Sequence, residues 1–251
     1  MLTHPTLDKL RQLRLTGMLT ALEEQLNTPD LQSLTFEERL GLMVDREISE
    51  RHHRRLQSRL KQAGFQQPAV WEDIDFKSPR GLDKSLLLHL ASCQWIEQHL
   101  NCLITGPTGA GKSWIATALA HKACRAGYSA RYLRLPRLLQ QLLIAKGDGS
   151  YPKLLKQLAQ FDLLLIDDWG LAPLDTNAQR DLLEVLDDRF HCHSTMLTSQ
   201  LPVSHWHDYL GNATLADAIL DRLVHNAYKI ELKGESMRKK TSLLTQPSPL
   251  A

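Results

Sequence analysis

Residues 101–116 read NCLITGPTGAGKSWIA, an apolar run followed by a glycine-rich turn that ends in Lys112 and Ser113. The turn, residues 106–113, matches G-x-x-x-x-G-K-[ST] at every fixed position. Glycines let backbone N–H groups curl around phosphates without a Cβ atom in the way. An apolar run precedes the turn and an alanine-rich stretch follows it, as strand and helix do around a phosphate loop. The stretch therefore predicts a phosphate-binding loop in an α/β fold.

The residues of this loop have distinct expected roles. A helix that starts near Lys112 directs its positive end at the phosphates. Lys112 is expected to reach the β- and γ-phosphates, and the Ser113 hydroxyl is expected to bind Mg²⁺. The predicted ATP-binding residues of this stretch are Gly106, Pro107, Thr108, Gly109, Ala110, Gly111, Lys112, Ser113 and Trp114.

Length and composition limit the class of protein. The 251 residues allow one α/β core and a small extra module, and 43% hydrophobic residues are typical of globular chains. The net charge is only +2, so attraction to nucleic acid has to come from local basic patches. No apolar run approaches a membrane span, and the N-terminus lacks the apolar core of a secretory signal. The four scattered cysteines fit a reducing cytoplasm.

Three parts with different patterns follow one another along the chain. Residues 1–65 are expected to form a helical domain, because leucines recur at helical spacing and residues 35–38 have the form of a capping box before a helix that runs to about residue 62. Residues 66–81 contain prolines and glycine and are expected to be a linker, packed down in places. Residues 241–251 are expected to be a flexible tail.

Residues 82–240 alternate between strand and helix patterns. This alternation predicts a five-stranded parallel sheet with helices on both faces. The expected strands are residues 101–105, 130–135, 160–168, 194–200 and 227–233. The expected helices are residues 83–98, 112–126, 175–189 and 213–225, with further helical material around 146–150.

A second chemical signal is the run LLLIDD at residues 163–168, an apolar strand that ends in two carboxylates. Ligands of open α/β sheets bind at the carboxyl ends of the strands. Asp167 is therefore expected to hold Mg²⁺ directly or through water, as a Walker B acid does. Asp168 is expected to orient or deprotonate the attacking water.

The strand at residues 194–200 is a candidate for the position between the phosphate-loop strand and the LLLIDD strand. Its end, residues 198–200, would then lie near the γ-phosphate, where a polar side chain could position water or sense the phosphate. A strand end with small polar residues and no chemical role fits the sequence equally well.

These stretches together resemble the IstB/DnaC branch of AAA+ ATPases, and IstB-like proteins most of all. The resemblance covers roughly residues 5–240. The stretches that carry it are LRLTGM at residues 13–18, GPTGAGKSWIATALAHKACRAGYSARYLR, DLLLIDDWGLAPL, TSQLP and ADAILDRLVHNAYKIELKGESMRKK.

The resemblance implies roles for three more residues. Gln200 is the best choice for sensor I, Arg222 matches an arginine finger that enters a neighbouring subunit's site, and Arg238 matches sensor II. It also implies an AAA+ core with little or no C-terminal lid. From the residues alone, Arg222 is an arginine on an amphipathic helix, where a surface ion pair is the usual outcome.

The resemblance implies an ATP- and Mg²⁺-dependent ATPase that forms homo-oligomers on duplex DNA. Such a protein acts as a transposition helper that recruits and stimulates an IstA-like transposase. The alternative is a DnaC-like loader that acts on single-stranded DNA and a replicative helicase. A small-molecule kinase is disfavoured, because the sequence shows no acceptor-binding lid with clustered arginines.

Two basic groups are candidate DNA contacts. Basic helix faces are often only solvated, and Glu47 and Glu50 partly neutralise the first group, so DNA contact stays open for both groups. No base-reading motif occurs, which favours binding through phosphates and DNA shape. The candidates are Arg51, Arg54, Arg55 and Arg59 in the first group, and Arg134, Arg137, Lys146 and Lys153 in the second.

Overall fold

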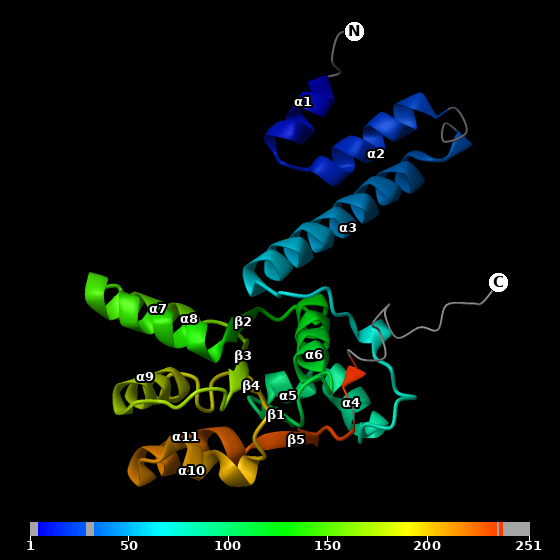
Figure 1. The fold of residues 1–251 in the computed structure, drawn as a ribbon. Helices are drawn as coiled ribbons and strands as arrows, with labels where there is room; N and C mark the ends of the chain where they lie inside the picture. The colour runs from blue at the N-terminus through cyan, green and yellow to red at the C-terminus, as the bar shows by residue number, and fades with distance from the viewer. Residues whose placement is uncertain (1–4, 29–32, 235, 238–251) are drawn as a thin grey trace, which may run out of the picture. The chain divides into compact units, whose positions relative to one another are not determined.

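The structure is a computed structural model that describes residues 5–28, 33–234 and 236–237. The chain forms two compact units that divide between Ser58 and Arg59. The division falls inside a helix and lies before residue 65, where the sequence placed the end of the helical domain. The N-terminal unit is all helical, and the second unit contains the sheet (Figure 1). The predicted flexible tail lies outside the described residues.

The helices of the N-terminal part are α1 (Pro5–Gln12), α2 (Thr16–Asn27) and α3 (Phe36–Ala63). The predicted capping box at the start of α3 is confirmed. The Thr35 N–H donates to Glu38 Oε2 at 2.8 Å, and the Glu38 N–H donates to Thr35 Oγ1 at 3.3 Å. Two of the N–H groups that a helix start leaves unpaired are satisfied in this way.

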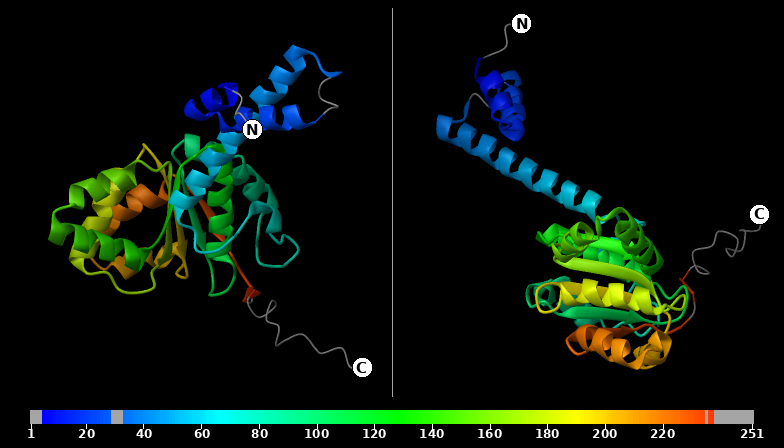
Figure 2. Two further views of the ribbon diagram at one scale, coloured as in Figure 1. Left: turned by 90° about the horizontal axis from the view of Figure 1, so that it is seen from above. Right: turned by 90° about the vertical axis from the view of Figure 1, so that its left-hand side faces the viewer.

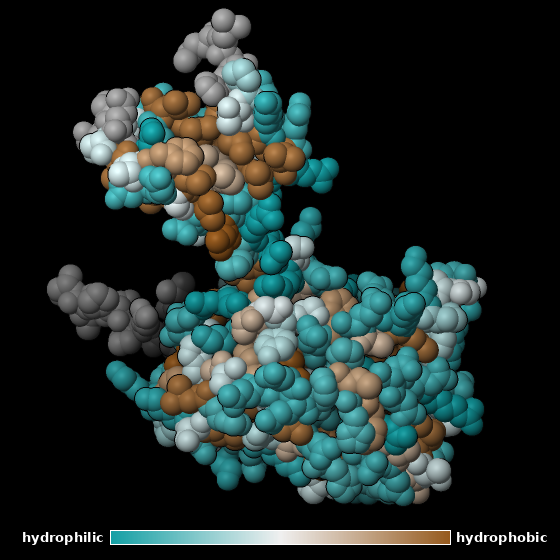
Figure 3. All heavy atoms as spheres, turned by 180° about the vertical axis from the view of Figure 1, so that it is seen from behind, coloured by the Kyte–Doolittle hydropathy of each residue, from teal (hydrophilic) through white to brown (hydrophobic). Residues whose placement is uncertain are grey.

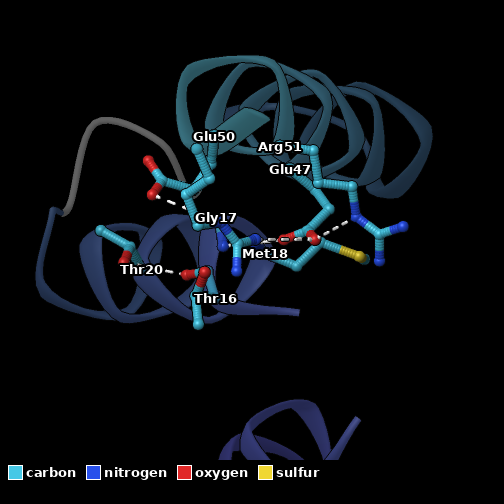
Figure 4. Close-up of polar contacts among 8 residues, drawn as sticks. Thr16, Gly17, Met18, Thr20, Glu47, Glu50 and Arg51 are labelled. Carbon is cyan, nitrogen blue, oxygen red and sulfur yellow. Dashed lines mark hydrogen bonds and ion pairs between the residues drawn. The ribbon is translucent and has the colours of Figure 1, made fainter. Parts of the chain in front are cut away.

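The leucine pattern before residue 28 did not show that this part contains two helices. The chain breaks between α1 and α2, where Arg14 has φ +58°. The break frees the first N–H groups of α2, and Gly17 and Met18 donate theirs to Glu47 Oε2 of α3 at 2.7 and 3.2 Å (Figure 4). A Cβ on Gly17 would lie 2.6 Å from the Glu47 Cα, so glycine is required for this approach. The last two residues of the LRLTGM stretch, Gly17 and Met18, thus join α2 to α3.

The N-terminal unit leaves several large apolar side chains exposed, and Figure 3 shows apolar residues gathered on its visible face. Patches of this kind on soluble proteins usually mark a surface that contacts another molecule. The exposed apolar residues are Leu13, Leu26, Phe36, Leu40, Leu42, Val44 and Ile48.

The second unit is built on a five-stranded parallel sheet of order β2-β3-β4-β1-β5, which confirms the predicted fold class. As proposed from the sequence, β4 lies between β1 and β3. The carboxyl ends of β1, β3 and β4 therefore meet at one edge. The strands are β1 (Asn101–Thr105), β2 (Ala130–Arg134), β3 (Leu163–Trp169), β4 (Ser194–Ser199) and β5 (Ala227–Glu231).

Helices cover both faces of this sheet, as parallel crossovers require (Figures 1 and 2). One face carries α4 (Lys84–Ala91), α5 (Gln94–Glu97) and α6 (Lys112–Ala126). The other face carries α7 (Leu135–Asp148), α8 (Tyr151–Ala159), α9 (Thr176–Asp187), α10 (Trp206–Leu210) and α11 (Ala213–Val224). Single turns of 3-10 helix occur at η2 (Trp71–Asp73) and η3 (Val203–His205). No helix among the described residues is long and apolar enough to cross a membrane.

The sequence analysis missed an interruption in each of two regions that it predicted to be helical. The region 83–98 forms two helices, because Cys93 adopts a left-handed conformation with φ +62° between α4 and α5. The KGDGS stretch is a helix end and turn, since Gly149 has φ +77° and terminates α7. In each region a residue with a positive φ interrupts the helical backbone, and hydrophobic periodicity does not reveal such an interruption.

The segment that the sequence suggested as a linker packs on α6. Ala69 and Ile74 are buried against Ala118, and Trp71 and Trp114 pack around them. The segment is therefore part of the second unit, and it covers the start of α6, next to the phosphate loop.

Candidate nucleotide-binding site

The loop between β1 and α6 has the backbone shape that its glycines predict. Gly106, Gly109 and Gly111 have φ values of +146°, +81° and +96°, a region that side chains with a Cβ rarely adopt.

Packing restricts the same three positions. A Cβ on Gly106 would lie 2.5 Å from the Leu232 carbonyl oxygen, and one on Gly111 would lie 2.6 Å from Arg80 Nη1. A Cβ on Gly109 would collide with Ser236. Segments before and after the sheet therefore determine the shape of the loop.

The loop also closes on itself. The Lys112 Nζ donates to the Pro107 carbonyl at 2.9 Å, and only 8% of Lys112 is exposed. The Met237 N–H donates to the Gly109 carbonyl at 2.8 Å. The lysine that the motif assigns to the phosphates is thus held over the loop.

Asp167 lies at the centre of the polar groups and is 4% exposed. Its Oδ1 accepts hydrogen bonds from Ser113 Oγ at 2.8 Å and from the Thr198 hydroxyl, and its Oδ2 accepts one from the Tyr132 hydroxyl at 2.7 Å. Burial and this bond raise the pKa of Tyr132, so the phenol remains a donor. A serine hydroxyl beside a carboxylate is the oxygen donor set that Mg²⁺ prefers, and the residues present fit this ion.

Asp168 lies beside this group in an unusual backbone conformation with φ +64°. The register of β3 against β4 shifts between Ile166 and Trp169, and such irregularities redirect side chains. The Asp168 carboxylate accepts a hydrogen bond from Arg134 Nε at 2.5 Å. This bond raises the pKa of Arg134. Arg134, a candidate DNA contact, is thus engaged with the candidate catalytic acid.

The end of β4 contributes the remaining polar groups. The Thr108 hydroxyl donates to Gln200 Oε1 at 2.8 Å, which joins the β4 end to the phosphate loop. Thr198 donates to Asp167, and its hydroxyl accepts the Asp168 N–H at 3.4 Å. Sequence reasoning chose Gln200 as the sensor, whereas Thr198 is the residue that contacts both acids.

A cavity of about 560 Å³ opens between these groups, within the size range of small-ligand sites. Its walls come from the phosphate loop, the ends of β3 and β4, and the segment before α4. The residues around it are Gln67, Asp73, Asp75, Arg80, Thr108, Gly109, Gly111, Lys112, Ser113, Trp114, Asp168, Thr198, Ser199, Gln200 and Met237.

The phosphate loop follows β1, the two acids stand at the end of β3, and β4 lies between these two strands. This arrangement is typical of a nucleotide-binding site. The family model for IstB-like ATP-binding proteins matches residues 8–245. The chain belongs to this family. The family is one of ATP-binding proteins, and residues of the phosphate loop line the cavity.

Two curated relatives and one solved structure illustrate the similarity. The insertion sequence ATP-binding protein y4pL of Sinorhizobium fredii is 52% identical over 95% of this chain and 98% of its own length. The insertion sequence IS1162 ATP-binding protein of Pseudomonas fluorescens is 57% identical over 81% of this chain and 89% of its own length. The crystal structure of DnaI covers 66% of this chain and 92% of that chain, with a TM-score of 0.58 and 20% identity. At this identity the last comparison shows the fold alone.

Arg222 lies at the amino ends of the strands, whereas the cavity lies at their carboxyl ends. Its carbonyl accepts a hydrogen bond at 2.8 Å from Asn101, the first residue of β1. Its guanidinium pairs with Asp187, donates to the Ala218 carbonyl at 2.7 Å and lies 5.7 Å from the centre of the Phe190 ring. The other family-derived arginine, Arg238, lies outside the described residues.

The basic side chains of α3 have different surroundings. Arg51 Nε donates to Glu47 Oε1 at 2.7 Å, and Arg54 lies 3.7 Å from the same carboxylate. Arg59 Nη1 donates at 3.0 Å to the Cys124 carbonyl at the end of α6. Arg55 is exposed. Of this first group, Arg55 is best placed to contact a phosphate backbone, and DNA contact stays a prediction.

The second basic group is likewise divided. Lys146 pairs with Asp181 and lies 5.0 Å from the centre of the Tyr151 ring. Arg137 donates to Gln140 Oε1 at 3.2 Å on the surface of α7, and Lys153 is exposed on α8. Arg137 and Lys153 therefore remain the more accessible candidates of this group.

Three residues of the site had little signal in the sequence. Tyr132 and Arg134 stand on β2, and the register places Arg134 opposite Asp167. A polar residue at the end of the neighbouring strand was the available signal, but it requires the strand order to be known. Arg80 lay in the segment read as a linker, where nothing in the local pattern pointed to a ligand.

Proposed function

We propose that this chain is a Mg²⁺-dependent ATPase that assembles with ATP on duplex DNA and recruits and stimulates its transposase. The observation that carries the proposal is the cluster of Ser113, Asp167 and Asp168 beside the phosphate loop. Membership in a family whose relatives are named as insertion sequence ATP-binding proteins supports the link to transposition.

The residues around the phosphate loop and the strand ends have distinct roles in this proposal. Lys112 and the N-terminus of α6 bind the β- and γ-phosphates. Ser113 and Asp167 hold Mg²⁺, which neutralises phosphate charge. Asp168 orients the attacking water and accepts its proton. Thr198 and Gln200 connect the γ-phosphate position with the two acids and the loop.

The Arg134–Asp168 pair bears on the rate of this reaction. Arg134 Nε occupies one oxygen of the Asp168 carboxylate, so a water has to compete with this charge-assisted hydrogen bond for that oxygen. Asp168 therefore has to loosen its contact with Arg134 before that oxygen can hold the water. Slow hydrolysis of this kind suits a protein that uses ATP to time an assembly.

Assembly between copies would complete the active site. Arg222 lies at the sheet edge opposite its own cavity, so it serves a neighbouring copy's ATP as an arginine finger. Arg238 contacts the phosphates within its own subunit in this proposal. The exposed apolar residues of the N-terminal unit provide a surface for the transposase, and the basic residues named above provide the DNA contacts. The reactions take place in the cytoplasm.

Particle size in solution tests the proposal. Purified protein is mixed with duplex or single-stranded DNA, with and without ATP, and Lys112→Ala is measured in parallel. Large particles on duplex that require ATP and are lost in the variant are the expected result. Preference for single strands, or assembly only with a helicase, would support a helicase loader instead. Monomers that turn over ATP rapidly would contradict both.

A salt titration tests the DNA contacts separately. Arg55→Ala and Lys153→Ala are expected to weaken duplex binding about twofold to fivefold each and to reduce its salt dependence, since each removes a phosphate contact. Glu24→Gln, a surface change without a proposed DNA role, is the control. Affinity that is insensitive to salt would show that these residues do not bind the backbone.

A further inference from the structure

Arg80 is a buried charge that the proposed chemistry does not use. It lies in the segment before α4, and 5% of it is exposed. Burying an ion costs several kcal/mol unless it is paired and hydrogen-bonded. Its surroundings therefore decide whether the residue supports the fold or awaits a ligand.

The hydrogen bonds of Arg80 are incomplete. Nη1 donates to the Ala110 carbonyl in the phosphate loop at 3.3 Å, and Nη2 donates to the Asp75 carbonyl at 2.9 Å. Nε is buried and has no partner in the part of the chain that the structure describes. Burial lowers the pKa of Arg80, although arginine remains protonated at neutral pH.

The charge of Arg80 is also not neutralised by a direct ion pair. Asp75, the nearby acid, turns its carboxylate to its own loop, where it accepts from the Lys77 N–H at 2.8 Å and from the Ser78 hydroxyl at 2.5 Å. Among residues 5–28, 33–234 and 236–237, no acidic side chain forms an ion pair with Arg80. The cation is thus partly desolvated, and the charge of the nearby Asp75 acts on it without a direct ion pair.

Arg80 lies where an anion would be bound. It borders the cavity of about 560 Å³ together with Lys112 and Gly111. The absent Cβ of Gly111 leaves the space that Arg80 Nη1 occupies. The guanidinium therefore contacts the phosphate loop at Ala110 and Gly111, and it borders the same cavity as Lys112.

We propose that Arg80 is a second cation of the nucleotide site, which braces the phosphate loop at Ala110 and whose charge is balanced by the phosphate groups of the bound nucleotide. The inference rests on the proposed function in one respect, namely that the cavity holds a nucleotide. It assigns to the segment before α4 a part in binding affinity.

Two substitutions separate charge from packing. Arg80→Met removes the charge and fills similar space, while Arg80→Lys keeps the charge. ADP with Mg²⁺ is titrated by calorimetry. We expect ADP affinity to fall about tenfold to a hundredfold in Arg80→Met and less than about threefold in Arg80→Lys. Arg125→Met, which removes a surface arginine that pairs with Glu72, is the matched control and is expected to bind ADP normally.

The melting temperature of the protein without nucleotide distinguishes the proposed role from a purely structural one. If Arg80 only stabilised the fold, Arg80→Met would melt at a lower temperature than the wild type. A buried cation without a direct ion pair contributes little to the stability of the empty protein, so Arg80→Met should melt at the same temperature as the wild type or higher, with a smaller shift on adding ADP. If Arg80→Met does not fold, Arg80→Gln replaces it with the same expected loss of affinity.

Three results would overturn the inference. The first is ADP binding by Arg80→Met that equals that of the wild type. The second is a loss of affinity in Arg80→Lys as large as that in Arg80→Met. The third is a melting temperature of empty Arg80→Met several degrees lower, with its ADP-induced shift kept. Lys112→Ala separates this failure from that of the proposed function. If the wild type binds ADP and Lys112→Ala does not, only the role of Arg80 fails; if the wild type does not bind ADP, the nucleotide site itself fails.

Discussion

The two ends of the sheet each bury an arginine, and the two arginines differ. At the amino end of the strands, Arg189 is 1% exposed and donates to Thr195, Leu158, Phe161 and Ser194 at 2.5–3.2 Å. At the carboxyl end, Arg80 is 5% exposed, and its Nε has no partner in the described chain.

The difference in hydrogen bonding distinguishes a buried polar group that stabilises the fold from one that is available to bind a ligand. All three nitrogens of Arg189 donate to protein atoms, and although burial lowers its pKa to about 9, it remains charged at neutral pH. The carboxyl end directs Lys112, Asp168 and Arg80 towards a cavity. The incomplete hydrogen bonds of Arg80 therefore distinguish it from Arg189, whose hydrogen bonds stabilise the fold.

The largest expected effect is on the rate of ATP hydrolysis, and it separates two acids at opposite ends of β3. Asp167→Asn should lower the rate of ATP hydrolysis about a thousandfold, because it removes a carboxylate from the proposed Mg²⁺ site. Asp162→Asn, just before β3, is the control. Among the described residues, the Asp162 carboxylate accepts hydrogen bonds from the Ser129 N–H at 2.7 Å and from the Ser129 hydroxyl at 2.8 Å, so we expect less than a twofold change. Phosphate release measures both variants, and equal losses would contradict the functional contrast between the two ends.

The next effect concerns stability at the amino end. Arg189→Met should lower the free energy of unfolding by about 3 kcal/mol, because it leaves the carbonyls of Leu158, Phe161 and Ser194 without their donor. Urea denaturation measures the change, and Arg80→Met, which should cost no stability, is the matched comparison. If the two variants were equally destabilised, incomplete hydrogen bonding would not distinguish the two arginines.

A third prediction uses the one residue at the amino end that we assign to catalysis. Arg222→Ala should reduce hydrolysis about a hundredfold and leave ADP binding unchanged, because its own cavity is at the other end of the sheet. Mixing it with Asp167→Asn should restore part of the activity. In a mixed assembly, the intact Arg222 of an Asp167→Asn copy can enter the intact site of an Arg222→Ala copy. No recovery in mixtures would rule out a role between subunits.

The smallest effect is expected in the N-terminal unit, where the buried charge of Glu47 is satisfied. Glu47→Gln should weaken the protection of the α2 amides by about 1–2 kcal/mol, because it replaces a charged acceptor of the Gly17 and Met18 N–H groups. Hydrogen exchange at neutral pH measures this change. Glu24→Gln, on an exposed pair 3.9 Å from Arg46, should change it very little.

The same carboxylate predicts a pH dependence. Burial of Glu47 acts to raise its pKa, but bonds from Arg51, Met18 and Gly17 outweigh burial and lower the pKa below 4.5. A lowered native pKa adds stability above the unfolded value, and this stability is lost as the pH falls through the native pKa. The wild-type N-terminal unit should therefore lose stability below about pH 4.5, and Glu47→Gln should lose less. Parallel curves for the two proteins would contradict this assignment.

The sequence predicted the framework of the second unit because each element had its own local signal. The loop glycines, Lys112 and the two acids after an apolar strand are short-range patterns, and the parallel order follows from the alternation of strands and helices. The capping box at the start of α3 was equally local.

Other features depended on contacts between distant segments. The break before Thr16 is set by Glu47, which lies some thirty positions away in the sequence. The pairing of Arg134 with Asp168 requires the strand register, and the position of Arg80 requires the fold of a segment without periodicity. No window of sequence contains both partners of these contacts.

The glycines of the phosphate loop have a consequence for the order in which the protein is made. Gly106 and Gly109 are confined by Leu232 and Ser236, which are translated long after the loop itself. A chain that is still being synthesised can form β1 and the start of α6, but it lacks the atoms that fix the loop. We therefore expect the newborn protein to gain nucleotide affinity only after residues 232–236 have been synthesised.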